Sequence, residues 1–146
     1  MRARDLLTDF PTVTLDTRIR DTAQLMAERD LAGLIVLDDG LPHSVLPGTQ
    51  VLALAVPGYC QEDPALARVV DEAHADRFLD DVGDRTVRDA LPPQPRELPV
   101  TDPDATILEV AALMARTRSP LVAVVGEGRY LGAITLTTLF DRVTGS

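Results

Sequence analysis

The 146-residue sequence contains no lysine, so all 14 of its basic side chains are arginine. The missing lysine excludes a P-loop lysine, a Schiff-base lysine and a Ser-Lys dyad. Against these arginines stand 23 acidic residues, which give a formal net charge of −9. Binding to a phosphate backbone needs a basic face, and this composition therefore argues against nucleic acid as a partner.

Cysteine, histidine and long apolar runs are also scarce. The single cysteine, Cys60, permits no internal disulfide and no cysteine zinc site, which is typical of a reducing compartment. The two histidines, His43 and His74, fit ordinary surface positions, and no serine has the context of a nucleophile elbow. No apolar run approaches the roughly 20 residues of a membrane-spanning helix, and residues 1–10 have no secretory apolar region. We therefore expect a cytoplasmic protein with no membrane insertion, no metal and no catalytic residues, which is not an enzyme.

The clearest pattern in the sequence is a helix signal that begins after Asp-Pro-Asp. Thr106 and Glu109 have the spacing of a capping box at a helix start. The apolar residues that follow recur at i, i+3, i+4 and i+7, the spacing of one buried helix face. These residues are Ile107, Val110, Ala111 and Met114.

Two strand signals and a second helix signal follow. The valine-rich run 121–125 is stopped by glycines, which predicts a buried strand entering a turn. Residues 130–135 are expected to form the returning strand, and residues 137–143 to start a closing helix. The segment from residue 100 to residue 142 thus predicts one compact supersecondary unit.

A second, weaker copy of this unit lies upstream, because shifting the sequence by 88 residues aligns the two without a gap. The matches fall on one helix face, one strand and one turn, as expected for an internal duplication. They include Asp16 on Asp104, Ile19 on Ile107, Ala23 on Ala111, residues 25–27 on 113–115, Val36 on Val124, Gly40 on Gly128 and Thr49 on Thr137. The shift predicts a buried stripe of Ile19, Ala23 and Met26 and a central strand over residues 34–37.

Each copy starts with a short lead-in, residues 4–7 and 88–91, and the copies are separated by an acidic stretch. Asp63 and Pro64 predict the start of an amphipathic helix that ends near Gly83. Its acids form either a solvated helix face or a divalent-metal site, and the first is favoured because acids on a helix diverge. We expect three parts: a first repeat over residues 1–61, an acidic inter-repeat helix and linker over 62–87, and a second repeat over 88–146.

The order of lead-in, helix, strand, strand and helix, present twice, resembles the cystathionine-β-synthase (CBS) domain, and the tandem pair resembles a Bateman module. The resemblance implies an α+β fold in which two βαββα repeats pack about a pseudo-twofold axis. It also implies clefts that in many relatives hold AMP, ATP or S-adenosylmethionine as a regulatory ligand, with no required cofactor. Related pairs commonly form homodimers, and a free-standing pair would regulate a transporter or an enzyme in trans.

Such relatives carry a Gly-x-x-Thr/Ser-x-x-Asp pattern where the last strand meets the last helix. In the second copy Gly132 and Thr135 match this pattern, but Thr138 replaces the aspartate that takes the ribose hydroxyls. In the first copy all three positions differ, as Ser44, Pro47 and Gln50. We therefore expect the second cleft to be the functional one and any adenosine ligand to bind weakly.

The resemblance assigns a set of ligand-binding residues to that second cleft. They are Val100, Thr101, Val122, Val124, Gly132, Thr135 and Thr138, with Arg116 and Arg118 as candidate phosphate contacts. One functional hypothesis is a CBS-pair regulatory module that binds an adenosine-containing or other small metabolite there and modulates a partner protein. The alternative is a structural dimerisation or docking module with vestigial ligand sites.

Overall fold

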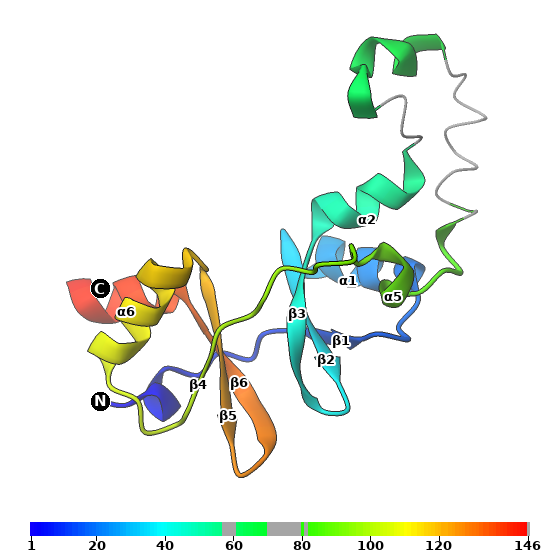
Figure 1. The fold of residues 1–146 in the computed structure, drawn as a ribbon. Helices are drawn as coiled ribbons and strands as arrows, with labels where there is room; N and C mark the ends of the chain where they lie inside the picture. Colours follow the sequence, from blue (N-terminus) through cyan, green and yellow to red (C-terminus); the bar gives the residue numbers. More distant parts are fainter. Residues whose placement is uncertain (57–60, 70–79, 81, 146) are drawn as a thin grey trace.

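The computed structural model describes residues 1–56, 61–69, 80 and 82–145, and it contains two units of similar architecture (Figure 1). The first unit comprises β1 (Thr12–Thr14), α1 (Ile19–Arg29), β2 (Gly33–Asp38), β3 (Leu41–Pro47) and α2 (Gly48–Ala55). The second comprises β4 (Val100–Thr101), α6 (Ile107–Thr117), β5 (Leu121–Gly126), β6 (Arg129–Thr135) and α7 (Leu136–Thr144). The described residues also include the short helices η1 (Ala3–Leu6), η2 (Pro64–Val69) and α5 (Val87–Ala90). The α+β fold class is confirmed.

The two units repeat each other in residue-level detail. In each sheet the central strand pairs in parallel with the first strand and antiparallel with the third. The register shifts after Val36 in one unit and after Val124 in the other, and the helices end at left-handed residues Asp30 and Arg118. Because each pair lies at the predicted shift of 88 residues, the structure confirms the internal duplication.

Helix α6 forms where the capping box predicted it. The Thr106 hydroxyl accepts a hydrogen bond from the Glu109 amide at 3.1 Å, and the Glu109 carboxylate accepts one from the Thr106 amide at 2.9 Å. Together these bonds satisfy two of the amides that a helix start leaves without partners. Val110 and Met114 are buried on the face that meets the sheet.

The predicted buried stripe on α1 is wrong at one residue. Ala23 is exposed, whereas Thr22, which corresponds to Val110 of the second unit, is completely buried. The helix therefore turns the i, i+3, i+7 positions Ile19, Thr22 and Met26 toward the sheet. Burial of the threonine is tolerated because its hydroxyl donates to the Arg18 carbonyl oxygen, one turn back, at 2.9 Å.

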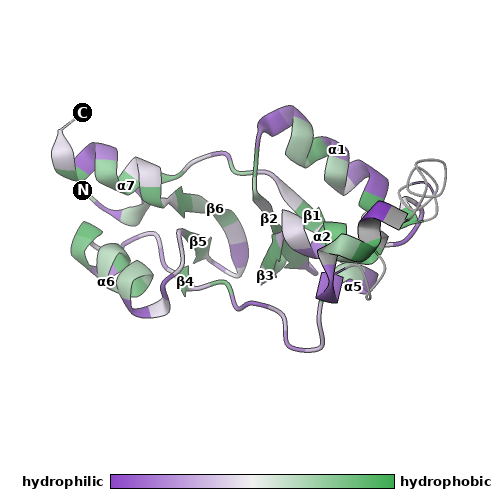
Figure 2. Cartoon of the chain, turned by 90° about the horizontal axis from the view of Figure 1, so that it is seen from above, coloured by the Kyte–Doolittle hydropathy of each residue, from purple (hydrophilic) through white to green (hydrophobic). Residues whose placement is uncertain are grey.

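The two sheets lie in the middle of the molecule and the helices on its two outer sides (Figure 2). Successive residues of a strand point to opposite faces, so the central strands contribute to two cores. Leu121 and Ala123 of β5 pack with Ile35 of β2 between the sheets, about the pseudo-twofold axis. Val122 and Val124 instead pack against the helices of their own unit.

The lead-in segments are exchanged between the units. Helix η1 precedes the first repeat, yet Ala3 and Leu6 are buried in the helix-side core of the second unit. Helix α5 precedes the second repeat, and Val87 and Ala90 are buried in the core of the first. The sequence suggested that each lead-in starts its own copy, but each one completes the core of the other copy.

The inter-repeat segment differs locally from the predicted amphipathic helix. Asp63 caps the segment as predicted, since its carboxylate accepts from the Ala65 amide at 3.1 Å, but residues 64–69 form a 3-10 helix. The rest of the predicted helix lies largely outside the described residues, as do Cys60 and His74. Within the described part of the chain, no helix could cross a membrane and no group of three His, Cys, Asp or Glu side chains could hold a metal.

Candidate ligand cleft beside helix α6

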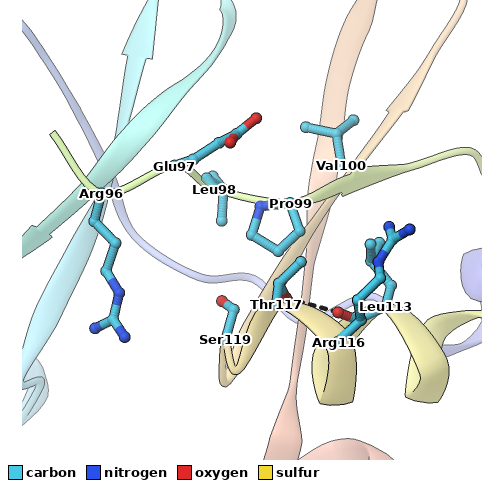
Figure 3. Close-up of a pocket in the computed structure, with 9 residues that line it drawn as sticks. All are labelled: Arg96, Glu97, Leu98, Pro99, Val100, Leu113, Arg116, Thr117 and Ser119. Atoms are coloured by element: carbon cyan, nitrogen blue, oxygen red, sulfur yellow. Dashed lines mark hydrogen bonds between the residues drawn. The ribbon is translucent and has the colours of Figure 1, made fainter. Parts of the chain in front are cut away.

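A cavity of about 650 Å³ lies between the strand that leads into the second unit and the C-terminal end of α6 (Figure 3). Its volume falls in the range of roughly 300 to 1,000 Å³ that is usual for small-molecule sites. The lining residues are Arg96, Glu97, Leu98, Pro99, Val100, Leu113, Arg116, Thr117 and Ser119. The cavity thus combines apolar side chains with three charged ones.

One wall of the cavity is the extended segment 96–100, which runs from the first unit to the second. The Arg96 carbonyl oxygen accepts from the Val45 amide of β3 at 3.2 Å, and the Pro99 carbonyl oxygen accepts from the Ala123 amide of β5 at 2.9 Å. Leu98 is buried between the sheets. These anchors fix the segment at both units, and the charged side chains beside them are left at the surface.

The other wall is the last turn of α6 and the residues after it. Its hydroxyl groups are used locally: Thr117 donates to the Leu113 carbonyl oxygen at 2.6 Å, and Ser119 donates to the Leu121 carbonyl oxygen at 2.7 Å. The helix stops at Arg118, which adopts a left-handed conformation. The group on this wall with free donors is therefore the guanidinium of Arg116.

The charged side chains of the cavity do not neutralise each other. Arg96, Glu97 and Arg116 have no ion pair and no side-chain hydrogen bond among the described residues. Two guanidinium groups against one carboxylate make the cavity locally positive in a chain whose net charge is −9. Guanidinium groups bind phosphate and carboxylate with two parallel hydrogen bonds, so the site suits an anionic ligand.

The structure brings together only some of the residues predicted for the second cleft. Val100, which is 47% exposed, and Arg116 line the cavity, and Thr101 is half-buried on the adjoining strand β4. Val122 and Val124 do not line a cleft: both are completely buried in the core against α6 and α7. The prediction failed because it did not assign the two faces of β5, whose even-numbered residues point to the helices.

Arg118, the second candidate phosphate contact, lies elsewhere. It lines an apolar groove of about 500 Å³ between α6 and α7, together with Phe140 and Leu139. The left-handed turn at Arg118 places this side chain on a different face from Arg116. The two arginines therefore do not act on one ligand.

The threonines of the sequence motif form a separate hydroxyl cluster. Thr135 caps α7 by accepting from the Thr138 amide at 3.1 Å, and its hydroxyl donates to the Thr138 hydroxyl at 2.9 Å. The Thr138 hydroxyl lies 3.2 Å from that of Thr8, which directly follows the exchanged lead-in. The motif hydroxyls are thus next to the lead-in of the first repeat, not next to Val100.

The same lead-in covers Gly132. A β-carbon at Gly132 would lie 3.2 Å from Cδ2 of Leu7, so a larger residue here would push this leucine side chain aside. In the first unit the corresponding Ser44 is completely buried, and its hydroxyl lies 2.9 Å from Nδ1 of His43. Sequence reasoning missed Thr8 because it assigned the first lead-in to its own repeat. It missed Arg96 and Glu97 because no motif marks the segment between the second lead-in and β4.

The phenol of Tyr130 borders a smaller cavity of about 230 Å³ that adjoins this region. This cavity is lined by residues 7–10 and 130–132. Burial, with a smaller contribution from the negative charge of Asp9, raises the pKa of Tyr130 to about 12. The hydroxyl of Tyr130 is buried and has no hydrogen-bond partner within the described structure. It stays protonated at neutral pH and is available as a donor.

The fold and the cleft define a tandem-repeat α+β module with an open, locally positive site. The family model for the CBS domain matches residues 3–46 and 87–145, so the chain belongs to the CBS domain family and contains a tandem CBS pair. A search of curated proteins found no match.

Solved structures agree with this assignment. A CBS domain-containing protein of unknown function from Kribbella flavida is 51% identical, with a TM-score of 0.92 and 99% of both chains covered. The CBS domain of a membrane protein from Sphaerobacter thermophilus is 19% identical, with a TM-score of 0.72 over 97% of this chain and 86% of that one. The protein CBSX2, solved in complex with AMP, is 19% identical, with a TM-score of 0.66 over 99% and 96% of the chains.

Proposed function

We propose that this chain is a regulatory CBS-pair module that binds an adenosine-containing or other anionic metabolite in the 650 Å³ cavity and modulates a partner protein. The observation that carries the proposal is the presence of two arginines, Arg96 and Arg116, without partners among the described residues, in one cavity with apolar walls. Leu98, Val100 and Leu113 supply an apolar surface for a flat ring. The module has a regulatory and not a catalytic role.

The AMP complex of CBSX2 motivates the choice of nucleotide for the first tests. AMP combines a flat apolar ring with a phosphate, which is the chemistry that an apolar wall and two guanidinium groups recognise. Figure 3 shows the guanidinium groups of Arg96 and Arg116 on opposite sides of Pro99 and Thr117. A ligand that occupies the cavity would thus meet a cation at either end.

The position of the cavity suggests how binding could be transmitted. Segment 96–100 is hydrogen-bonded to β3 of the first unit and to β5 of the second. A ligand that contacts this segment favours the arrangement of the two units in which its contacts are best formed. A partner in trans, such as a transporter or an enzyme, would then respond to that arrangement through linkage.

Calorimetric titration with AMP, ADP, ATP and S-adenosylmethionine tests the proposal. Arg116→Ala should weaken binding of an anionic ligand by about tenfold to a hundredfold, because a hydrogen bond to a charged group contributes about 1.5–3 kcal/mol. Arg118→Ala is the matched control: this arginine is two residues away and lines the other groove. Equal effects of the two substitutions, or no binding of any of these ligands, would contradict the proposed site.

A homodimer or docking role is the second candidate, and a specific surface favours it. On α6 and α7 the side chains of Leu108, Phe140 and Val143 are 78%, 57% and 65% exposed. Phe140 also lines the apolar groove of about 500 Å³ between α6 and α7, so this face presents more apolar surface than an isolated exposed side chain would. We propose that a second copy of the chain covers this face.

Light scattering tests the assembly. The native chain should have a mass of about twice 15.8 kDa at micromolar concentration, and Phe140→Ser should shift the equilibrium toward monomer. Leu41→Ser is a matched control, since Leu41 is a similarly exposed apolar residue, 42% exposed, on β3 of the other unit. A native monomer, or a dimer unaffected by Phe140→Ser, would contradict this interface.

A further inference from the structure

The groove between α6 and α7 has a counterpart between α1 and α2, so the molecule carries the same helix face twice. Three lining residues of each groove correspond under the shift of 88 residues: Ala111, Leu139 and Phe140 in the second unit, and Ala23, Val51 and Leu52 in the first. The volumes differ, at about 500 Å³ in the second unit and about 330 Å³ in the first. The two equivalent faces are therefore not equally open.

In the first unit the chain itself fills part of the groove. Val82, which is 9% exposed, packs in the core with Ile19 and Val51. The Gly83 carbonyl oxygen accepts from the Arg20 amide at 3.0 Å, and a β-carbon at Gly83 would lie 2.9 Å from Nη2 of Arg20. The groove of the second unit is lined only by α6, α7 and the residues directly after α6, at the opposite end of the molecule (Figure 2). No distant segment of the described chain covers it.

The charged groups beside the two grooves differ as well. Arg118 lines the groove of the second unit, and Asp141 follows Phe140 on α7. Both charged side chains are exposed, and neither has an ion pair among the described residues. The corresponding residues of the first unit are Asp30 and Ala53, which cannot pair with each other. Opposite charges at these two positions are thus a property of the second unit.

We propose, building on the dimer proposed above, that two copies associate through their second units alone, with Phe140 of each copy in the α6/α7 groove of the other and Asp141 paired with Arg118 across a twofold axis. A twofold interface must be self-complementary, because each contact occurs twice with the roles of the copies exchanged. An exposed aromatic side chain beside an open groove, and a cation near an anion, meet this requirement. The first units lie at the far ends of the dimer, since Val82 and Gly83 occupy the groove that an incoming side chain would need.

Sedimentation equilibrium measures the dimer dissociation constant of the native chain and of two matched variants. Phe140→Ser should raise this constant by at least about tenfold, as expected for an aromatic side chain at the centre of an interface. Leu52→Ser is the control, because Leu52 is the equivalent residue of the first unit and both side chains are 57% exposed. It should leave the dissociation constant within about twofold of the native value.

A charge exchange tests the ion pair. Arg118→Asp and Asp141→Arg should each raise the dissociation constant by about tenfold, since each lost pair occurs twice in the interface. The double variant restores both pairs with the charges exchanged, and its constant should return to within about threefold of the native value. Arg118→Asp suits the left-handed backbone, because Asp30 has this conformation at the equivalent position of the first unit.

The outcomes separate this inference from the proposed dimer. If Phe140→Ser and Leu52→Ser weaken the dimer equally, the first units take part in a head-to-tail contact; association through the second units alone is then refuted while the dimer stands. If the effects of the two charge reversals add in the double variant, the pairing of Arg118 with Asp141 is refuted. A native monomer refutes both this inference and the proposed dimer.

Discussion

The exchange of the lead-in helices makes a quantitative prediction about which unit each of them stabilises. Leu6 is 1% exposed and packs with Ala105 and Val110 in the core of the second unit. Leu6→Ala removes three buried carbon atoms and leaves a cavity, which in well-packed cores costs about 2–5 kcal/mol. Its sequence neighbour Leu7 is 36% exposed, so Leu7→Ala should cost clearly less.

The reciprocal substitution is Val87→Ala in helix α5. Val87 is completely buried with Ile19 and Val36 in the core of the first unit. Removal of two buried carbon atoms at about 0.8 kcal/mol each, with a cavity contribution added, predicts a loss of about 1.5–3 kcal/mol. Urea unfolding curves measure both losses, because the midpoint falls with stability at constant slope.

Native-state hydrogen exchange tells which unit is affected. Leu6→Ala should reduce amide protection in α6 and β5 more than in α1 and β2, and Val87→Ala should do the reverse. The reasoning would be refuted if Leu6→Ala loosened α1 and β2 preferentially. It would also be refuted if the substitution cost clearly less than about 2 kcal/mol, the lower end of the range for Leu→Ala in a well-packed core.

Two further predictions concern single side chains. In a Tyr59→Phe background the phenol of Tyr130 should titrate near its raised pKa of about 12 in an ultraviolet absorbance titration. A raised pKa means that the folded state favours the neutral phenol over the phenolate. The folding stability that this preference contributes is fully present below pH 10 and is lost as the pH rises toward 12. A midpoint near 10 in the folded protein would contradict the burial of this hydroxyl. Thr106→Ala should destabilise α6 by about 1 kcal/mol in urea unfolding, since it removes a capping hydrogen bond.

Much of each unit could be predicted from the sequence because the signals are local. The capping box at Thr106 and the 3.6-residue spacing after it determine where α6 starts and which face is buried. The glycines at 40 and 128 follow the central strands and adopt positive φ in both turns. The shift of 88 residues carried these assignments from one copy to the other.

Where the prediction failed, the missing information was non-local. Thr22 and Ala23 are adjacent on α1, and only the packing of the helix on the sheet decides which of them is buried. Val122 and Ala123 are adjacent in an all-apolar run, yet one faces the helices and the other faces the second sheet. A run of apolar residues on a strand buried on both sides has no alternation from which the two faces could be read.

The location of the cleft was likewise decided by tertiary structure. The sequence by itself determined two copies of one unit, the residues of the threonine motif and the candidates Val100 and Arg116. That Thr138 meets Thr8, and that Arg96 and Glu97 line a cavity with Arg116, depends on the crossing of each lead-in to the opposite unit. Contacts between residues more than a hundred positions apart form because they complete a buried core, and the free energy of that burial depends on both units together.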